Sequence, residues 1–344
     1  MNIIQSNLRK SLLTVPLSIA ASLTFTNNSM SEVLEVQMDA PNFDRWMYPY
    51  NATPGTRSAG PTFAGSEGAD DRYGQNMYGF ITQDVITPDL GKFSYEIQSA
   101  ELQIQISNDN VIYDPSYDSW ETYKNPKKFP DQDLGRPFEL FGANFRNDWN
   151  GWSFGESGPG PFAFGVEERN VYPIAFNASG LPIDVSNNLR DEYNPIPFAI
   201  GENDQVQPGG FLPELAVMTF DLDVTDTNIQ CYLRESLNDG LLSLVLTSLH
   251  FGTQDGGGSY PQIILKESPL VAIGAASAAT LNLTVVINDG ATMAEDLNGD
   301  NEVDVTDLLI LIADWGDCNC CPSDINSDGE VDVVDLLAVI AAWS

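Results

Sequence analysis

The last 50 residues of the chain contain an internal repeat, which constrains the local fold more strongly than any other feature of the sequence. Residues 296–309 and 324–337 align without gaps, 28 positions apart, and both read Asp-x-Asn-x-Asp-x-Glu-Val-Asp-Val-x-Asp-Leu-Leu. The similarity continues to Trp315 and Trp343. A duplicated unit is expected to adopt one local structure twice, and this residue order predicts an acidic loop followed by a helix.

The spacing of oxygen-bearing side chains in each loop is that of an EF-hand calcium site. Side-chain oxygens fill positions one, three, five, nine and twelve, and position seven supplies a backbone carbonyl. Position six needs a left-handed residue, which Gly329 supplies in the second loop and Asn301 in the first. We therefore predict two calcium ions, held by Asp296, Asn298, Asp300, Glu302, Asp304 and Asp307 and by Asp324, Asn326, Asp328, Glu330, Asp332 and Asp335.

Each acidic loop leads into an apolar stretch, and we expect the two helices to pack on one another. The residues predicted at that contact are Leu308, Leu309 and Ile312 in the first helix and Leu336, Leu337 and Ile340 in the second. Residues 295–344 carry thirteen acids and no Lys or Arg. Because these carboxylates repel one another, we expect the ion-free segment to be partly or wholly unfolded. Acidic turns without a metal explain two fully occupied loops in register less well.

This pattern resembles the type I dockerin, a duplicated calcium loop and helix that inserts into a cohesin receptor on a scaffold or cell surface. Asp at position twelve and Asn at position three are both dockerin-like. The resemblance implies partner recognition at Val305, Thr306, Val333 and Val334. The segment departs from the family in lacking the usual hydroxyl pair there, in lacking basic residues on its helices and in its Cys-rich spacer. Packing beneath the loop is the alternative role for Val305 and Val333.

Three of the four cysteines, Cys318, Cys320 and Cys321, lie in that spacer, and Cys231 lies far upstream. In an exported protein a short disulfide such as Cys318 to Cys321 would tie the two repeats together. Four cysteines permit three pairings, which the sequence leaves open. A zinc site is the competing interpretation, but it lacks a nearby fourth ligand.

The first 25 residues have the order of a secretory signal peptide. Arg9 and Lys10 precede a short apolar stretch from Leu12 to Ala21, with small residues near its end. That stretch is too short to span a bilayer, so we expect export and removal rather than anchoring. The alternative is an uncleaved N-terminus of a cytosolic protein.

Residues 31–289 show a hydrophobic period of two, which predicts a β-sandwich domain. Leu102, Ile104 and Ile106 alternate with polar residues, and Met218 and Phe220 do the same. Further strands are predicted over residues 241–249, 262–266 and 280–286, and we expect no long helix before Asp296. Many short strands between Gly, Pro and Asn turns favour a jelly-roll-like sandwich, so the predicted fold class is mainly β with a small α-helical C-terminal module.

Residues 109–170 are predicted to form a long aromatic loop, too rich in rings to be disordered. Aromatic faces beside carboxylates and amides suit sugar rings, so a glycan is a candidate ligand. The residues assigned to it are Trp46, Tyr48, Trp120, Tyr123, Trp149 and Trp152. The alternative, equally favoured, is that these rings pin irregular loops onto the sandwich.

A second resemblance concerns the middle of the chain. An Arg-Trp pair, a Gly-rich loop, Tyr78-Gly79-Phe80, the run Ile97-Gln-Ser-Ala-Glu-Leu-Gln-Ile and the late Tyr260-Pro261-Gln-Ile-Ile-Leu follow one another. This order resembles secreted bacterial β-sandwiches of the DNRLRE type, some relatives of which bind polysaccharides. It covers about two thirds of the chain and implies a jelly roll, without identifying a ligand.

Charge excludes some functions. With 15 Lys and Arg against 49 Asp and Glu, the formal net charge is −34 at pH 7, which opposes contact with nucleic acids and anionic lipids. Gly151-Trp152-Ser153-Phe154-Gly155 matches the hydrolase string G-x-S-x-G, but Gly and Pro follow where a helix is required. The single His250 lies in a strand pattern, and no carboxylate pair stands out as catalytic.

Three functions therefore remain. The favoured one is a secreted or cell-surface calcium-binding protein whose sandwich binds a glycan or partner and whose dockerin-like module tethers it to a receptor. The second is a polysaccharide-degrading hydrolase or lyase on a jelly-roll scaffold, and the third is a structural surface or matrix protein. An enzyme is the less favoured class because no compact catalytic constellation is visible, and no membrane span is expected in the mature chain.

Overall fold

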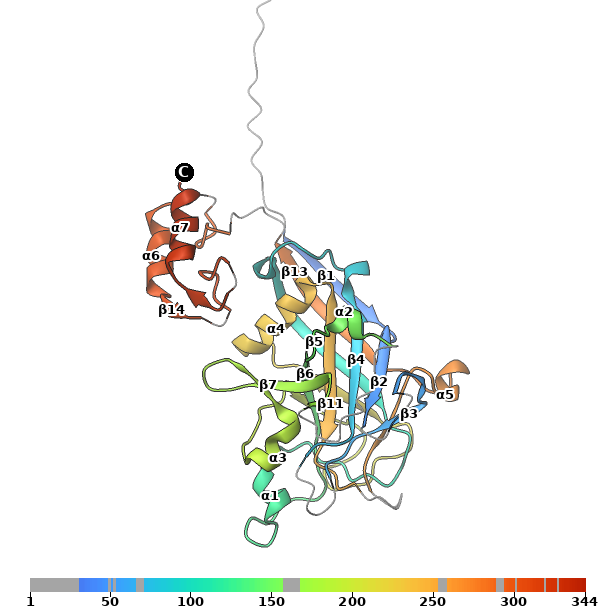
Figure 1. The fold of residues 1–344 in the computed structure, drawn as a ribbon. Coiled ribbons are helices and arrows are strands. Elements are labelled where there is room, and N and C mark those ends of the chain that lie inside the picture. The colour runs from blue at the N-terminus through green and yellow to red at the C-terminus, as the bar shows by residue number, and fades with distance from the viewer. Residues whose placement is uncertain are drawn as a thin grey trace, which may run out of the picture.

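A computed structural model gives the fold and describes residues 31–48, 51, 54–65, 71–156, 168–252, 259–288, 294–300, 302–318, 320–326 and 328–344. The predicted signal peptide and Asn301 lie outside these residues. The described chain is mainly β, with two large antiparallel sheets, two small two-stranded sheets and a small helical module at the C-terminus; the mainly β class is as predicted (Figure 1). No described helix is long and apolar enough to cross a membrane.

The first sheet has the strand order β1-β13-β5-β10, and the second has the order β2-β4-β11-β6-β7-β8, with β9 also paired to β6. Every pairing is antiparallel. The strands of the first sheet are β1 (Ser31–Met38), β13 (Thr280–Asn288), β5 (Tyr95–Gln105) and β10 (Val217–Asp221). Those of the second are β2 (Phe43–Met47), β4 (Gln75–Ile81), β11 (Leu241–Ser248), β6 (Phe138–Phe145), β7 (Val171–Phe176), β8 (Pro182–Asp184) and β9 (Ala199–Ile200).

The core lies between the two sheets. One hydrophobic cluster contains Leu102 and Leu283 of the first sheet together with Phe80, Leu140 and Leu244 of the second. The burial of β5 alternates over most of its length, as the period of two predicts. The strands predicted over residues 241–249, 262–266 and 280–286 are confirmed as β11, β12 (Gln262–Ile264) and β13, with β12 pairing β3 (Ala59–Pro61).

The structure overturns the expectation that no long helix precedes Asp296. Helix α4 (Thr227–Asn238) begins at Asp226, whose side chain accepts hydrogen bonds from two backbone N–H groups of the first turn. Its buried Ile229, Leu233 and Leu237 recur every four residues and join the main core. Only three apolar residues mark the helical period, and α4 lies between two segments with clear strand patterns, β10 and β11. The helix was therefore not predicted.

The predicted aromatic loop 109–170 is also not a single loop. It contains β6, a central strand of the second sheet whose first six residues are all buried. A strand covered on both faces loses the alternation on which the prediction relied. The same stretch contains the short helices α1 (Trp120–Lys124) and α2 (Gly151–Phe154); two others are α3 (Asn188–Asp191) and α5 (Pro269–Ala272).

The C-terminal module, residues 295–344, consists of α6 (Val305–Ala313), α7 (Val333–Ala341) and the two-residue strands β14 (Gly316–Asp317) and β15 (Glu330–Val331). Its core is formed by Val303, Leu311, Val331 and Val339. The predicted helix contact is therefore only partly right. Leu308 and Leu336 pack against this core, whereas Leu309, Ile312, Leu337 and Ile340 are 50 to 61% exposed.

Two disulfides involve all four cysteines. Cys318 pairs with Cys321 inside the spacer, which is one of the pairings the sequence left open. Cys320 pairs with Cys231 on α4, so the module is covalently attached to the sandwich. Figure 1 shows α6 and α7 beside the end of the sandwich to which α4 belongs.

Candidate metal centre

Helices α6 and α7 both begin at an aspartate that closes the acidic loop before it. Asp304 and Asp332 each accept a hydrogen bond from the backbone N–H two positions further on, at 2.7 and 2.6 Å. Each also forms a capping box with the residue three positions later, Asp307 or Asp335. These caps satisfy N–H groups at the helix start and fix positions nine and twelve of the loops.

The carboxylates at position twelve, those of Asp307 and Asp335, are fully buried. Asp307 accepts hydrogen bonds from the N–H groups of Leu297, Asn298 and Asp304 at 2.8, 3.1 and 2.8 Å. Asp335 makes the same three contacts at 2.9, 3.2 and 2.9 Å. Burial raises the pKa of Asp307, but the backbone donors outweigh it, and its pKa lies below the ordinary value. The group is therefore held as a charged carboxylate.

The first-position aspartates fold each loop back on itself. Asp296 accepts hydrogen bonds from the N–H groups of Gly299 and Asp300 at 2.8 and 3.1 Å. Asp324 accepts two in the second loop, at 3.1 and 3.0 Å. Gly329 has φ +92°, the left-handed conformation predicted at position six. In both loops the first-position aspartate thus accepts the N–H of position five, from Asp300 or Asp328.

The predicted calcium sites take side-chain oxygens from both carboxylates and amides. Among the described residues of the module, no three acidic side chains place oxygens within 4.8 Å of one another. Oxygens that share a calcium ion at 2.3–2.6 Å lie at most about 5 Å apart. The carboxylates alone therefore do not define the predicted sites, whose ligand sets also include the amides of Asn298 and Asn326.

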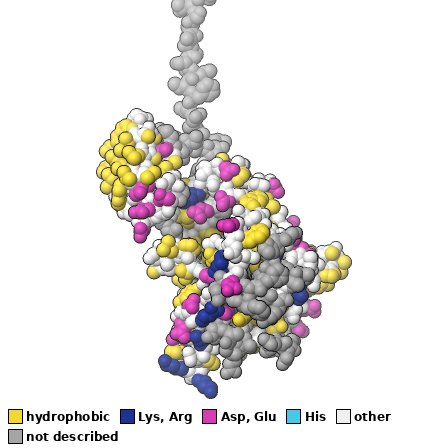
Figure 2. Space-filling model, viewed as in Figure 1, with side chains coloured by type: hydrophobic (Ala, Val, Ile, Leu, Met, Phe, Trp, Pro, Cys, Tyr) yellow, Lys and Arg dark blue, Asp and Glu magenta, His cyan; other side chains and the backbone are white. Residues whose placement is uncertain are grey.

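The outer surface of the helix pair is apolar. Nine large hydrophobic side chains there are 46 to 61% exposed: Val305, Leu309, Ile312, Trp315, Val333, Val334, Leu337, Ile340 and Trp343. We call this set the apolar face. Figure 2 shows hydrophobic side chains gathered over the module. Contiguous apolar surface on so acidic a segment is typical of a docking surface.

The residues predicted to recognise a partner lie on this face or at its edge. Val305, Val333 and Val334 are 50 to 54% exposed, and Thr306 is exposed as well. The alternative role of Val305 and Val333, packing beneath the loops, is contradicted because both side chains are 54% exposed. Recognition by these four residues stays a prediction.

The six aromatic residues assigned to a glycan do not form one platform. Trp46 and Tyr48 stack at 4.7 Å at the main core, and Trp120 and Tyr123 pack in a separate cluster with Leu189. Trp149 packs against a third cluster, on the other face of the second sheet. Trp152 is 46% exposed and borders a cavity of about 400 Å³.

The hydrolase string and the histidine have structural settings. Ser153 lies in α2, where its side chain and that of Asn150 form a capping box. His250 is buried, and its Nδ1 lies 3.1 Å from Ser248 Oγ. Burial lowers the pKa of His250 to about 3, with a further contribution from the positive charge of Arg136. The ring is therefore neutral at physiological pH.

Sequence reasoning missed two acidic groups in the sandwich. Oxygens of Asp44, Glu156 and Glu267 lie within 4.8 Å of one another, and so do oxygens of Asp114, Asp118 and Asp133. The only sequence signal for the second group is that acidic residues lie close together along the chain, at Asp114 and Asp118 and at Asp131 and Asp133. Among 49 acidic residues such spacings are too common to be selective.

The chain was compared with protein-family models and with curated proteins, and neither comparison found a match.

Proposed function

We propose that this chain is an exported calcium-binding protein whose C-terminal module, once loaded with calcium, attaches the β-sandwich to a receptor protein. The observation that carries the proposal is the coupling of two elements in one 50-residue segment. Two loops with every ligand position filled lead directly into the two helices that expose the apolar face.

Calcium and docking are linked through the loop ends. The carboxylates at position twelve belong to the first turns of α6 and α7 and accept hydrogen bonds from the start of each loop. An ion held by the loop therefore stabilises the helix start and the face beyond it. Thirteen acids without a basic residue make the unliganded module self-repelling, so the binding energy is spent on folding.

The receptor that we propose is cohesin-like, with an apolar docking surface. Eight residues of the apolar face form four identical pairs in the two repeats, as expected for a duplicated docking element, and Val334 alone has a different counterpart, Thr306. The module contains no Lys or Arg, so contact with such a receptor must rest on apolar burial rather than on basic residues. Charged residues that rim the receptor would be basic rather than acidic.

Export is supported by the cysteines. All four are paired in disulfides, and one disulfide joins residues 89 positions apart. Such bonds form and persist in oxidising compartments. The basic and apolar order of the first 25 residues agrees with that location.

For the sandwich, the cavity beside Trp152 supports neutral glycan binding. Its lining combines the exposed Trp152 ring with Asn150, Glu235 and Asp239. An aromatic face and hydrogen-bonding side chains are what a sugar ring requires. Loss of binding to a polysaccharide panel in Trp152→Ala, with Trp120→Ala as the control, tests this role, and unchanged binding refutes it.

The calcium half of the proposal is tested by titration of the full chain. In Asp296→Ala/Asp324→Ala, the C-terminal sites should be lost and the helix signal in circular dichroism should fall. Asp317→Ala removes an exposed acid of the same module outside both loops and should leave both unchanged. If the double variant binds as many ions as the natural chain, the loops are not the calcium sites.

The receptor half is tested by surface plasmon resonance against a panel of cohesin domains. The natural chain should bind at least one domain in calcium and release it in chelator. Leu309→Asp/Leu337→Asp should abolish that binding while the calcium stoichiometry stays unchanged. If no cohesin binds while calcium binding is intact, the cohesin-like receptor is refuted and the calcium assignment stands.

A further inference from the structure

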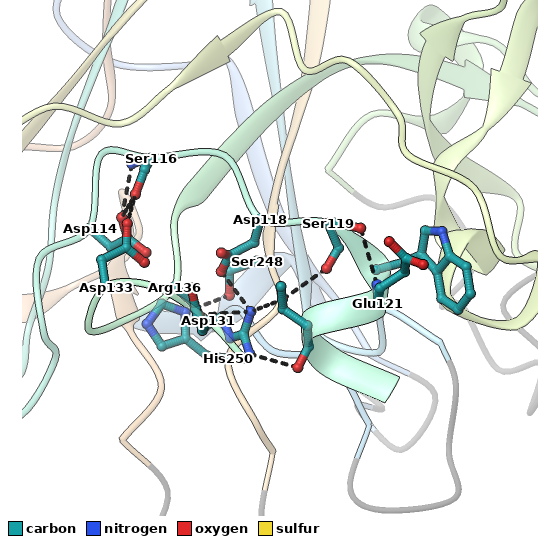
Figure 3. A network of polar contacts seen from close by, with 12 residues as sticks. Asp114, Ser116, Asp118, Ser119, Glu121, Asp131, Asp133, Arg136, Ser248 and His250 are labelled. Carbon is teal, nitrogen blue, oxygen red and sulfur yellow. Dashed lines mark hydrogen bonds and ion pairs between the residues drawn. The ribbon is translucent and has the colours of Figure 1, made fainter. Parts of the chain in front are cut away.

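Four carboxylates gather beside helix α1, on loops that the second sheet holds in place. Asp114 and Asp118 precede α1, and Asp131 and Asp133 lie between α1 and β6. We call these four residues the Asp114 cluster; Figure 3 shows them with their contacts. Gly135, with φ +113°, allows the second loop to approach, because a Cβ there would lie 2.9 Å from the Cβ of Asp114.

The carboxylates of the cluster are drawn close together. Oxygens of Asp114, Asp118 and Asp133 all lie within 4.8 Å of one another. The Ser116 hydroxyl bridges two of them, because it contacts Asp114 Oδ1 and also Asp133 Oδ2, the latter at 2.5 Å. In Figure 3 the carboxyl groups of Asp114 and Asp133 lie side by side next to Ser116. The spacing is that of oxygens sharing one cation.

One buried oxygen in the cluster has no hydrogen-bond partner. Asp114 is 1% exposed, and its Oδ1 accepts the N–H of Ser116 at 2.9 Å, but its Oδ2 is unsatisfied. An unsatisfied carboxylate oxygen shielded from water is costly, and a bound cation is one partner that removes the cost. The unsatisfied Asp114 Oδ2 is a second observation that points to a cation, separate from the short distances between the carboxylates.

The charge of the cluster is not balanced by the groups around it. Arg136 contacts Asp118 at 2.7 Å and Asp131 at 3.3 Å. His250, which also faces Arg136, is neutral. Four acids with one arginine leave an excess of negative charge.

The other acidic group of the sandwich is compensated differently. Lys266 Nζ lies 2.5 Å from Glu156 and 2.9 Å from Glu267, and the Lys266 N–H donates to Asp44 at 2.7 Å. An ammonium group therefore already occupies the position between two of those three carboxylates. The Asp114 cluster has no lysine among the contacts of its described residues, which makes it the better cation site.

We propose that the Asp114 cluster is a calcium site of the sandwich, separate from the acidic loops of the C-terminal module. Asp114, Asp118 and Asp133 supply the oxygen ligands, and Asp131 and Arg136 flank them. All three ligands are carboxylates, and hard oxygen donors suit calcium rather than zinc or copper. The ion clamps the loops on both sides of α1 against the second sheet.

The test counts bound calcium on four full-length proteins by equilibrium dialysis with radioactive calcium. The natural chain should hold about three ions, two in the acidic loops and one in the cluster. Asp114→Asn/Asp133→Asn should lose one ion, and Asp296→Ala/Asp324→Ala should lose two. Asp109→Asn/Asp204→Asn, which changes two exposed acids of the sandwich, should lose none.

The outcomes separate this inference from the proposed function. If the cluster variant binds as many ions as the natural chain, the cluster site is refuted whatever the loops do. If the loop variant retains every ion, the proposed function fails while the cluster site can still stand. Should the double cluster variant not fold, Asp133→Asn alone replaces it, because Asp133 is exposed.

A second readout uses the loop variant Asp296→Ala/Asp324→Ala. Its melting temperature should rise by about 3 °C or more between excess chelator and saturating calcium, because only the folded sandwich binds the ion. Adding Asp133→Asn should remove most of that rise. An equal melting temperature in calcium and in chelator would overturn the proposal.

Discussion

The acidic loops of the C-terminal module take their oxygen atoms from twelve consecutive residues each, whereas the Asp114 cluster takes its oxygens from segments on both sides of α1. In the loops, the backbone N–H groups that orient the carboxylates come from the same short segment. In the Asp114 cluster, the second sheet holds the two segments on either side of α1 in place. We therefore expect the acidic loops to need an ion to fold, whereas the sandwich assembles the Asp114 cluster as it folds.

The largest expected effect follows from this difference. Excess chelator should abolish hydrogen-exchange protection throughout α6 and α7, because thirteen unneutralised acids oppose their packing, while β5 and β13 stay protected. Mass spectrometry of the exchanging full-length chain measures both regions together. If α6 and α7 stay protected in chelator, the C-terminal module does not need an ion to fold, and this prediction is wrong.

A second prediction concerns the arginine of the cluster. Arg136→Met should destabilise the chain by about 3–5 kcal/mol in chelator, because it leaves the buried Asp118 without its counter-charge. The loss should be clearly smaller in calcium, since removing the arginine strengthens ion binding. Urea denaturation in both buffers measures the difference, with Lys127→Met, at an exposed lysine, as the control. Equal losses in the two buffers would contradict an ion in the cluster.

A third prediction uses pH. The pKa of His250 falls from 6.5 to about 3 on burial, so the unfolded chain binds a proton between these values and the folded chain does not. Stability contributed by neutral His250 is thus present above pH 6.5 and is lost as pH falls toward 3. Relative to His250→Gln, the natural chain should lose about 1.4 kcal/mol for each pH unit below 6.5. Parallel stability curves from pH 7 to 5 would show that the ring takes up a proton in place.

The smallest effect on stability is expected at the apolar face. Leu309→Gln/Leu337→Gln should change the free energy of unfolding by less than about 0.5 kcal/mol, since both side chains are exposed. Fluorescence of a hydrophobic dye in calcium should nevertheless fall. Val33→Gln/Ile273→Gln, at exposed apolar residues of the sandwich, should leave more dye signal than the module variant. If the module variant and the sandwich variant lose the same dye signal, the apolar face does not act as one continuous binding surface.

Features that depend on neighbouring residues could be predicted from the sequence. The alternation in β5 and the left-handed Gly329 are local properties, and the structure has both. The helix starts at Asp304 and Asp332 follow from the same loop pattern. A twelve-residue loop carries its own geometry in its spacing, so candidate ligands could be predicted without knowledge of the fold, and they stay a prediction.

Features that depend on tertiary burial could not be predicted in the same way. Both faces of β6 are covered, so it shows no alternation, and α4 presents only a short stripe to the core. The choice of Leu308 over Leu309 as the packed residue depends on how α6 meets α7. The Asp114 cluster depends on two loops meeting, which no spacing within either loop encodes.

The bond between Cys231 and Cys320 determines how mechanical tension would travel through a tethered molecule. Force applied to α7 reaches the spacer and is transmitted through the Cys231–Cys320 disulfide to α4. Leu233 and Leu237 of α4 are buried in the sandwich core. The residues between Cys231 and Cys320 form a closed covalent ring, so β13 is shielded from that pull. The sandwich would be held through α4, and its last strand, β13, would not be peeled away from the sheet.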